Sequence, residues 1–335
     1  MPAAERLFQP DPQCDGGTGR PILNNMTAPA PYSGPFHTDE LAAQALAQQS
    51  SPGAGIRPFM PDQHREFFAG LPYIFMATAD RRGWPVPSLV SGAPGFVQSP
   101  DPTTLTISAR PGEDDPATAG LLEGAPVGLL GLDLTNRRRN RANGIVRAIG
   151  PGGFAVDVSQ SFGNCAQYIQ TRYPRPRPSV PAATEQIASL DPAARRLIAG
   201  ADTFFVASRS REGLASGGLD MSHRGGRPGF VGVHGDELRI PDFRGNRFFN
   251  TLGNLLGDPR AGLLFIDFAS GELLQLQGHV TIEWAPKDGL PAGTQRLWRF
   301  AVERGFRRRD ALAFDWKFGE FAPTTLATAA WAVED

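Results

Sequence analysis

Short hydrophobic runs separated by turn residues dominate the chain from about residue 60 onward. The first run is YIFMATAD, which ends at the Arg82-Gly83 turn, and the next are PVPSLVSG, GFVQ, TLTISA, VGLLGLDL and NGIVRAIG. Gly, Pro, Asp or Asn bounds each run, which is typical of β-strands joined by tight turns. The segment MPDQHREFFAGLP predicts a short helix entered through Pro61-Asp62. The pattern therefore predicts a meander of five or six strands behind one helix.

The same pattern occurs twice along the chain, at an offset that begins at 130 and becomes 134 after a longer turn in the second copy. The paired segments are ATADRRG with ASRSREG, GAPGFV with GRPGFV, LTISA with LRIPD, and APVGLLGLDL with DPRAGLLFIDF. Each copy is expected to hold a helix, three strands, a second helix (PATAGLLEG or RFFNTLGNLLGD) and a β-hairpin. Two such halves can pack on each other as the subunits of a symmetric dimer do.

The repeat divides the chain into four parts. Residues 1–55 are rich in Pro, Gly, Ala and Gln and are predicted to form a partly disordered arm with one helix at about residues 38–49. The first half is expected at residues 56–175 and the second at 191–335. A proline-rich linker at 176–190 is predicted to join them.

Composition excludes several function classes. The 335 residues carry 33 basic and 34 acidic side chains, so the net charge of -1 gives no general attraction to nucleic acid or to anionic lipid. No stretch approaches the roughly 20 apolar residues of a membrane-spanning helix. Cys14 and Cys165 are the only cysteines, and no basic-then-apolar leader opens the sequence. We therefore expect a cytoplasmic location, no membrane contact and no nucleic-acid partner.

The sequence also lacks several catalytic motifs. It contains no G-x-x-x-x-G-K-[ST], H-E-x-x-H or G-x-S-x-G, and no Cys/His cluster at metal-ligand spacing. Nucleoside triphosphate chemistry, zinc hydrolysis and the serine-hydrolase elbow are disfavoured, and no metal site is predicted.

The second copy contains the strongest sign of a binding site. A strand that ends in Asp242-Phe243 is followed by Arg244, Asn246 and Arg247, and then by a helix that is expected to begin near Phe249-Asn250-Thr251. Two guanidiniums, amides, a hydroxyl and the N–H groups of a helix start are what a phosphate monoester selects. The segment predicts an anion cradle.

The first copy lacks this cradle. Pro111, Glu113 and Asp114 stand where the second copy has its basic and amide groups, and only Thr118, opposite Thr251, is retained. Because two carboxylates repel a phosphate, we predict one phosphate pocket in the chain, built by the second half and walled by the first.

The expected strand SHRGG-x-PGFV, the run PDFRGNRFFNTLGNLL-x-x-P-x-x-GLLFIDF and the expected helix SFGNC-x-x-YIQ-x-R resemble the pyridoxamine 5'-phosphate oxidase-like flavoproteins, in particular a duplicated bacterial subfamily. The resemblance covers residues 60 to about 285. The resemblance implies a mainly β fold of two tandem split β-barrels, an intramolecular pseudo-dimer with FMN bound between them. It places three residues on the flavin-contacting strand and two beside the ribityl chain. The former are Ser222, His223 and Arg224, and the latter are Pro241 and Asp242.

The chain departs from the family pattern in two places. Asn250 and Thr251 stand where the family has its basic phosphate-binding pair, so Arg244 and Arg247 are expected to substitute from the preceding loop. The C-terminal Arg/His substrate motif of the true oxidases is not recognisable in TQRLWRFAVERGFRRRD. Pyridoxamine phosphate is therefore not the expected substrate.

Two functions stay open at this point. The first is an FMN-dependent oxidoreductase with a small-molecule substrate or an electron donor such as NAD(P)H, although no residue is an obvious general base. The second is a flavin- or haem-binding module without turnover, since one fold is reused for several ligands. The sequence leaves open whether two chains associate as a homodimer.

Three further features have two or more interpretations. His223 either orients flavin or substrate or is a structural strand residue. Cys165, at an expected helix start, is either a buried structural thiol or a redox or substrate contact. The arginines of the hairpin NRRRNRANG are solvated, bind nucleic acid, or cross to the other half and assist the flavin's negative groups. These arginines are Arg137, Arg138, Arg139 and Arg141.

Overall fold

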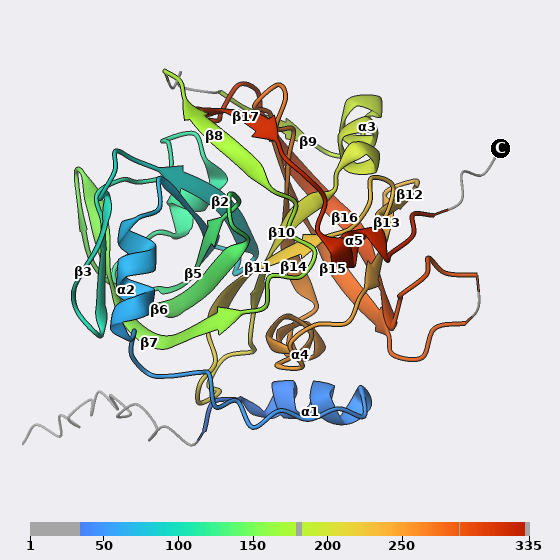
Figure 1. Cartoon of the computed structure of the whole chain (residues 1–335), viewed down its shortest axis with the longest axis horizontal. Helices are drawn as coiled ribbons and strands as arrows, with labels where there is room; N and C mark the ends of the chain where they lie inside the picture. The colour runs from blue at the N-terminus through green and yellow to red at the C-terminus, as the bar shows by residue number, and fades with distance from the viewer. Residues whose placement is uncertain (1–33, 179–182, 288, 332–335) are drawn as a thin grey trace, which may run out of the picture. The chain divides into compact units, whose positions relative to one another are not determined.

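Two antiparallel sheets, one from each copy of the repeat, form most of the structure in Figure 1. A computed structural model describes residues 34–178, 183–287 and 289–331. Residues 1–33 of the predicted arm lie outside the described residues. The remainder of that arm includes helix α1 (Thr38–Leu46), which begins where the sequence predicted a helix. No helix in the described ranges is long and apolar enough to cross a membrane.

The first half contains a seven-stranded sheet in the order β2-β1-β5-β6-β7-β4-β3. A helix precedes the sheet, and a short 3-10 helix stands where the sequence predicted the second helix of this copy. The elements are α2 (Asp62–Ala69), β1 (Tyr73–Ala79), β2 (Pro85–Ser91), β3 (Val97–Asp101), β4 (Thr104–Ile107), η1 (Pro116–Gly120), β5 (Pro126–Asp133), β6 (Arg138–Gly150) and β7 (Gly153–Asn164).

The second half repeats this topology, with its main sheet in the order β11-β10-β14-β15-β16-β13-β12. Position for position this is the strand order of the first half, which confirms the internal duplication and the two tandem split barrels. The elements are α3 (Pro192–Gly200), β10 (Thr203–Arg209), β11 (Leu219–Gly225), β12 (Gly232–His234), β13 (Glu237–Asp242), α4 (Asn250–Gly257), β14 (Arg260–Ile266), β15 (Leu273–Glu283), β16 (Arg296–Arg308), β17 (Phe314–Phe318) and α5 (Pro323–Leu326).

The segment between the halves takes part in pairing. Strand β8 (Arg172–Pro176) pairs with β17, and β9 (Thr184–Ile187) adds to the edge of the second sheet beside β16. The helix predicted over SFGNC-x-x-YIQ-x-R is wrong: β7 continues to Asn164, and irregular backbone leads to β8. The reason is that residues up to Asn164 pair with β6, so the sheet overrides the local helical spacing.

Alternation along the first strand of each half divides its side chains between two cores. In β1, Ile74 and Met76 pack inside the first barrel, whereas Phe75 on the opposite face joins a core shared by both halves. Strand β10 does the same, with Phe204 inside the second barrel and Phe205 in the shared core. A period of two puts successive residues on opposite faces, so a fully apolar strand can serve both cores.

The halves meet through equivalent residues, as subunits of a symmetric dimer would. The rings of Phe75 and Phe205 stack with centroids 3.7 Å apart and planes 17° apart. On either side, Gly128 lies against the backbone of Asp220, and Gly262 lies against the backbone of Pro85; a Cβ would approach these backbones to 2.8 and 2.4 Å. Glycine is required at both positions because a side chain would push the halves apart.

We predict that Gly128→Ala destabilises the protein by about 1–3 kcal/mol, because a Cβ at this position overlaps backbone that cannot rotate away. Urea denaturation measures the change. Gly150→Ala is the matched control, since nothing lies within 4 Å of a Cβ there, and it should change the free energy of unfolding by less than about 1 kcal/mol. Equal effects of the two substitutions would contradict close packing between the halves.

Candidate functional site

A cavity between the two halves collects the residues predicted from the sequence. It has an empty volume of about 830 Å³, including space open to solvent. All ten predicted residues line it, namely Ser222, His223, Arg224, Pro241, Asp242, Arg244, Asn246, Arg247, Asn250 and Thr251. The first half contributes Arg139, Arg141 and the stretch around Cys165, so residues of both halves form the walls.

The loop between β13 and α4 forms the cationic end of the cavity. Arg244 and Arg247 are exposed there, and among the described residues neither guanidinium forms an ion pair with a carboxylate. Arg247 and Phe249 have φ values of 65° and 62°, in the left-handed region that non-glycine residues seldom adopt. Asn246 accepts a hydrogen bond from the Phe248 amide with its Oδ1 and so supports the turn. Such strain is typical of functional loops.

Helix α4 begins at this loop without a side-chain cap. Its N-cap residue is Phe249, whose side chain offers no hydrogen-bond acceptor to the first-turn amides. The first N–H groups of a helix have no partner within the helix and carry the positive end of its dipole. Together with Arg244 and Arg247, they make this end of the cavity suited to an anion.

The start of α4 is fixed to the first half by a buried polar network. Ser222 Oγ lies 2.7 Å from Thr251 Oγ1 and accepts a hydrogen bond from Arg141. Arg141 also donates to Asp220 Oδ2 at 2.7 Å and to Asn250 Oδ1 at 3.4 Å. Because these side chains satisfy one another, Ser222, Asn250 and Thr251 act chiefly by positioning the helix start, and their contribution to ligand binding stays a prediction.

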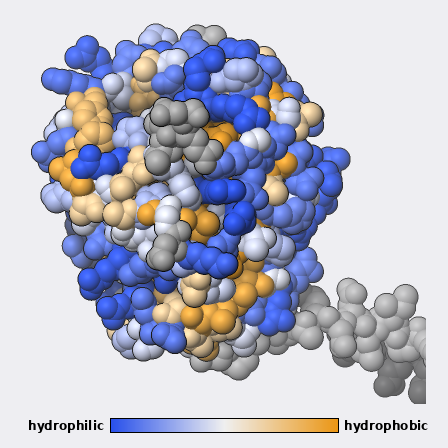
Figure 2. All heavy atoms as spheres, turned by 90° about the vertical axis from the view of Figure 1, so that its right-hand side faces the viewer, coloured by the Kyte–Doolittle hydropathy of each residue, from blue (hydrophilic) through white to orange (hydrophobic). Residues whose placement is uncertain are grey.

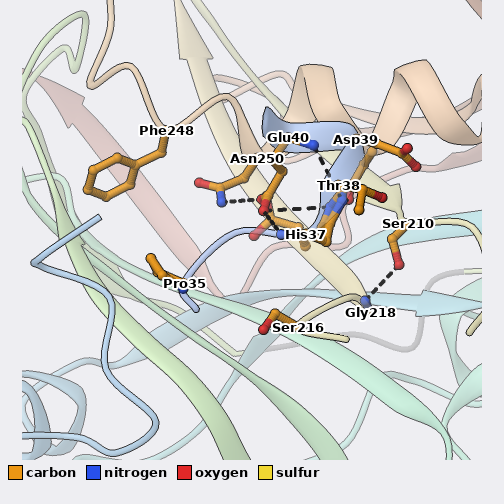
Figure 3. A network of polar contacts seen from close by, with 12 residues as sticks. Pro35, His37, Thr38, Asp39, Glu40, Ser210, Ser216, Gly218, Phe248 and Asn250 are labelled. Carbon is orange, nitrogen blue, oxygen red and sulfur yellow. Dashed lines mark hydrogen bonds and ion pairs between the residues drawn. The ribbon is translucent and has the colours of Figure 1, made fainter. Parts of the chain in front are cut away.

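Helix α1 contacts Asn250 through Glu40, as Figure 3 shows. Glu40 accepts hydrogen bonds from the Asn250 side-chain amide and from the His37 backbone amide. His37 in turn bonds Asn254 Oδ1 through Nε2 at 2.9 Å. Burial raises the pKa of Glu40 to about 8, so this side chain is protonated at neutral pH. A neutral carboxyl group therefore joins the N-terminal segment to the site.

Asp242, at the end of β13, is a shared partner for two arginines. It accepts hydrogen bonds from Arg224 and from Arg296, whose Nε and Nη2 each lie 2.7 Å from Oδ2. Arg224 also lies over the ring of Trp298, 4.6 Å from its centroid. One carboxylate thus compensates two guanidiniums, and Pro241 beside it supplies backbone to the wall of the cavity.

Arg139 and His223 meet on another wall. Arg139 Nη1 lies 3.1 Å from His223 Nδ1, and Arg139 Nε donates to the Cys165 carbonyl at 2.9 Å. Burial, followed by the charges of nearby arginines, lowers the pKa of His223 well below its usual range. Of the three interpretations of the arginine hairpin, the crossing to the other half describes Arg137, which pairs with Glu320, as well as Arg139 and Arg141. Arg138 is exposed.

Several lining residues escaped the sequence analysis. Arg296 and Gln49 belong to segments without a recognised motif, and Tyr168 comes from the predicted helix that does not form. The Tyr168 hydroxyl donates to the Arg244 carbonyl at 3.1 Å, and its ring packs on Phe243 with centroids 5.4 Å apart. No local signal marked Tyr168, because the spacing of SFGNC-x-x-YIQ predicted a helix, whereas Cys165 lies directly after the end of β7.

The equivalent place in the first half is filled by an internal ion pair. Asp115 accepts hydrogen bonds from Ser88, the counterpart of Ser222, and from Gln275. It also forms a buried ion pair with Arg308. Glu113 and Asp114 line an adjacent cavity, at the acidic positions that the sequence comparison identified. In the first half, therefore, the arginine at this place is already paired with a carboxylate of the chain itself.

Comparisons with known proteins give one family match. The family model "Pyridoxamine 5'-phosphate oxidase" matches residues 60–188. A search of curated proteins found no match.

Three of the solved structures that resemble the chain cover between 35% and 38% of it. A HupZ variant from Group A Streptococcus shares 10% identity, covers 35% of this chain and 98% of its own, and has a TM-score of 0.28. A FAD-binding protein from Mesorhizobium loti shares 9%, covers 37% and 97%, and scores 0.26. A Clostridium acetobutylicum protein related to general stress protein 26 of B. subtilis, of the pyridoxinephosphate oxidase family, shares 14%, covers 38% and 92%, and scores 0.27.

We predict that Glu40 makes stability fall with rising pH. Its pKa of about 8 in the folded protein exceeds the ordinary value of 4.5, so between these values the folded state holds a proton that the unfolded state has lost. The free energy of unfolding then decreases by about 1.4 kcal/mol per pH unit across that window, relative to Glu40→Gln. Urea midpoints of both proteins at several pH values from 5.5 to 8 measure the difference. Parallel curves for the two proteins would contradict a buried neutral Glu40.

Proposed function

We propose, on the premise that this chain belongs to the pyridoxamine 5'-phosphate oxidase-like family, that the cavity between its halves binds FMN and that the protein is an oxidoreductase acting on a small molecule. The family membership supports a flavin as the type of cofactor. The preference for FMN rests on the charges and donors of the cavity.

The excess of arginine in the cavity carries this proposal. Six arginines line it against one carboxylate, Asp242. Arg224 and Arg296 are paired with Asp242, and Arg141 with Asp220 behind the wall. The other three, Arg139, Arg244 and Arg247, have no carboxylate partner within the described ranges. A ligand that carries about two negative charges, as a phosphate monoester does, compensates this excess.

The groups present fit FMN. Arg244, Arg247 and the uncapped first turn of α4 would hold the phosphate, since all of them donate hydrogen bonds and none accepts. The ring pair Tyr168 and Phe243 gives the cavity an aromatic wall, and buried His223 contributes a ring nitrogen without a partner. When bound, the flavin supplies electron or hydride transfer. The chain positions it between the halves and limits the access of water.

Electron transfer through the cavity has a direct test. The absorption spectrum of the purified protein distinguishes flavin from haem. Anaerobic addition of NADH or NADPH then distinguishes an oxidoreductase using these donors, whose flavin absorbance disappears, from a binding module, whose flavin stays oxidised. A soluble donor of this kind is part of the proposal.

We predict that Arg247→Glu lowers the affinity for FMN by about 10- to 100-fold, because it removes a charge-assisted contact to the phosphate and adds repulsion. The affinity for riboflavin, which has no phosphate, should change less than threefold. Isothermal titration or fluorescence quenching with both ligands measures this.

Asp114→Ala is the control from the equivalent acidic segment of the first half, where Asp114 lines a different cavity. It should leave both affinities unchanged. Equal losses of FMN in the two variants, or equal losses of FMN and riboflavin in Arg247→Glu, would count against a single phosphate end beside α4.

A further inference from the structure

Arg139 differs from the buried arginines around it. Within the described residues it has no carboxylate at ion-pair distance: its Nε and Nη2 face the Cys165 carbonyl and Sγ, at 2.9 and 3.7 Å, and its Nη1 faces His223. Arg139 itself is partly buried, and each of the five fully buried arginines has a carboxylate partner. These are Arg141, Arg172, Arg296, Arg307 and Arg308.

The surroundings of Arg139 disfavour the charged form of its guanidinium. Burial lowers the pKa of Arg139 to about 10, and the neighbouring Arg141 and Arg224 act in the same direction. At neutral pH it therefore keeps its charge in a place that disfavours it, with only neutral acceptors around it. Replacing a buried ion without a partner is commonly stabilising, so a group of this kind points to a ligand rather than to folding.

Arg139 also determines which nitrogen of His223 carries the proton. A guanidinium can only donate, so Nδ1 of His223 is the acceptor in the contact at 3.1 Å. The neutral ring then has its hydrogen on Nε2. His223 is 5% exposed, lines the cavity, and its Nε2 has no hydrogen-bond partner among the described residues. A buried donor without a partner costs about 1–3 kcal/mol, which a ligand acceptor would recover.

The pair lies apart from the phosphate end. Arg141, which contacts Asn250 at the start of α4, is two residues beyond Arg139 on β6. Residues two apart on a strand share a face and lie about 7 Å apart. Arg139 and His223 therefore form a second donor group of the same cavity, one step farther from α4.

We propose that Arg139 and His223 form a second anion-accepting subsite, which contacts the electron-rich edge of the flavin ring and stabilises the ring when reduction makes it negatively charged. The proposal rests on FMN binding in this cavity. Arg139 supplies the charge, and His223, oriented by Arg139, supplies the donor. Because Arg139 belongs to the first half, this half tunes the reactivity of a cofactor whose phosphate is held by the second.

Arg139→Met tests whether the charge of Arg139 affects the flavin, and Arg139→Lys restores a positive charge at this position. Arg138→Met is the matched control, since Arg138 is exposed and lies over Phe67 of the first half. Dithionite titration against a reference dye gives the midpoint potential of the bound FMN. Arg139→Met should weaken binding of the reduced flavin at least tenfold more than binding of the oxidised flavin, which lowers the potential by about 30 mV for two electrons. Arg139→Lys should retain most of the wild-type potential, and Arg138→Met all of it.

Two measurements without flavin complete the test. The unliganded Arg139→Met protein should be at least as stable to heat as the wild type, because a partly buried charge without a carboxylate partner has been removed. Nitrogen-15 NMR of histidine-labelled protein should show His223 neutral with its proton on Nε2 in the wild type. In Arg139→Met the pKa of His223 should rise, because one of the three arginine charges that lower it has been removed. Arg224 and Arg172 remain.

The outcomes separate the two proposals. An FMN potential in Arg139→Met equal to that of the wild type overturns this inference and leaves FMN binding intact. Failure of the wild type to bind either FMN or riboflavin overturns both. A lowered potential together with undiminished thermal stability supports the subsite, and a lowered potential that Arg139→Lys fails to restore overturns the role assigned to charge.

Discussion

The stack of Phe75 on Phe205 determines how the two barrels meet, and the cavity depends on that contact. The stacked residues occupy equivalent positions in the two copies, with a glycine on each side that lets backbone approach backbone. A small shift in this interface would separate Arg139 and Arg141 from their partners on β11. The relative positions of the polar side chains therefore depend on the apolar core, which is rigid because it is densely packed.

Duplication followed by divergence explains why the two ends of the interface differ. In both halves a serine of the second strand belongs to a network in which an arginine is paired with an acid. Ser222 contacts Arg141, which is paired with Asp220, and Ser88 contacts Asp115, which is paired with Arg308. Only the second copy adds Arg244 and Arg247 beside this network, and neither has a carboxylate partner among the described residues. One copy thus keeps its positive charge available to a ligand, and the other consumes it within the chain. The hydropathy of the surface gives no comparable sign: the face of the second half in Figure 2 is largely hydrophilic, with hydrophobic residues in separate patches.

Local patterns in the sequence predicted most of the fold and part of the candidate site. The strands and their duplication followed from the repeat, because two-residue alternation and turn residues act over short distances. The simple meander expected for each copy was wrong, since β1 pairs with β5 and β4 with β7. The clustering of Ser222 with Arg247 followed from the same comparison. The comparison of the two copies could not identify Glu40 and Arg296. Glu40 contacts Asn250, 210 residues away in the sequence, and Arg296 contacts Asp242, 54 residues away. The helix expected at Cys165 failed for the opposite reason: a short local pattern was overridden by pairing with a neighbouring strand.

The distribution of the polar partners along the chain has a consequence for biogenesis. Arg141 is synthesised 79 residues before Asp220, and Glu40 emerges long before the helix it contacts. Domains generally fold as units, N-terminal first, during translation. A nascent first barrel therefore displays an uncompensated guanidinium and a bare aromatic face, Phe75 included, until the ribosome has delivered β10 and β11. During that interval the twin barrel of another nascent chain offers the same apolar surface, so mispairing between polysome neighbours competes with correct closure.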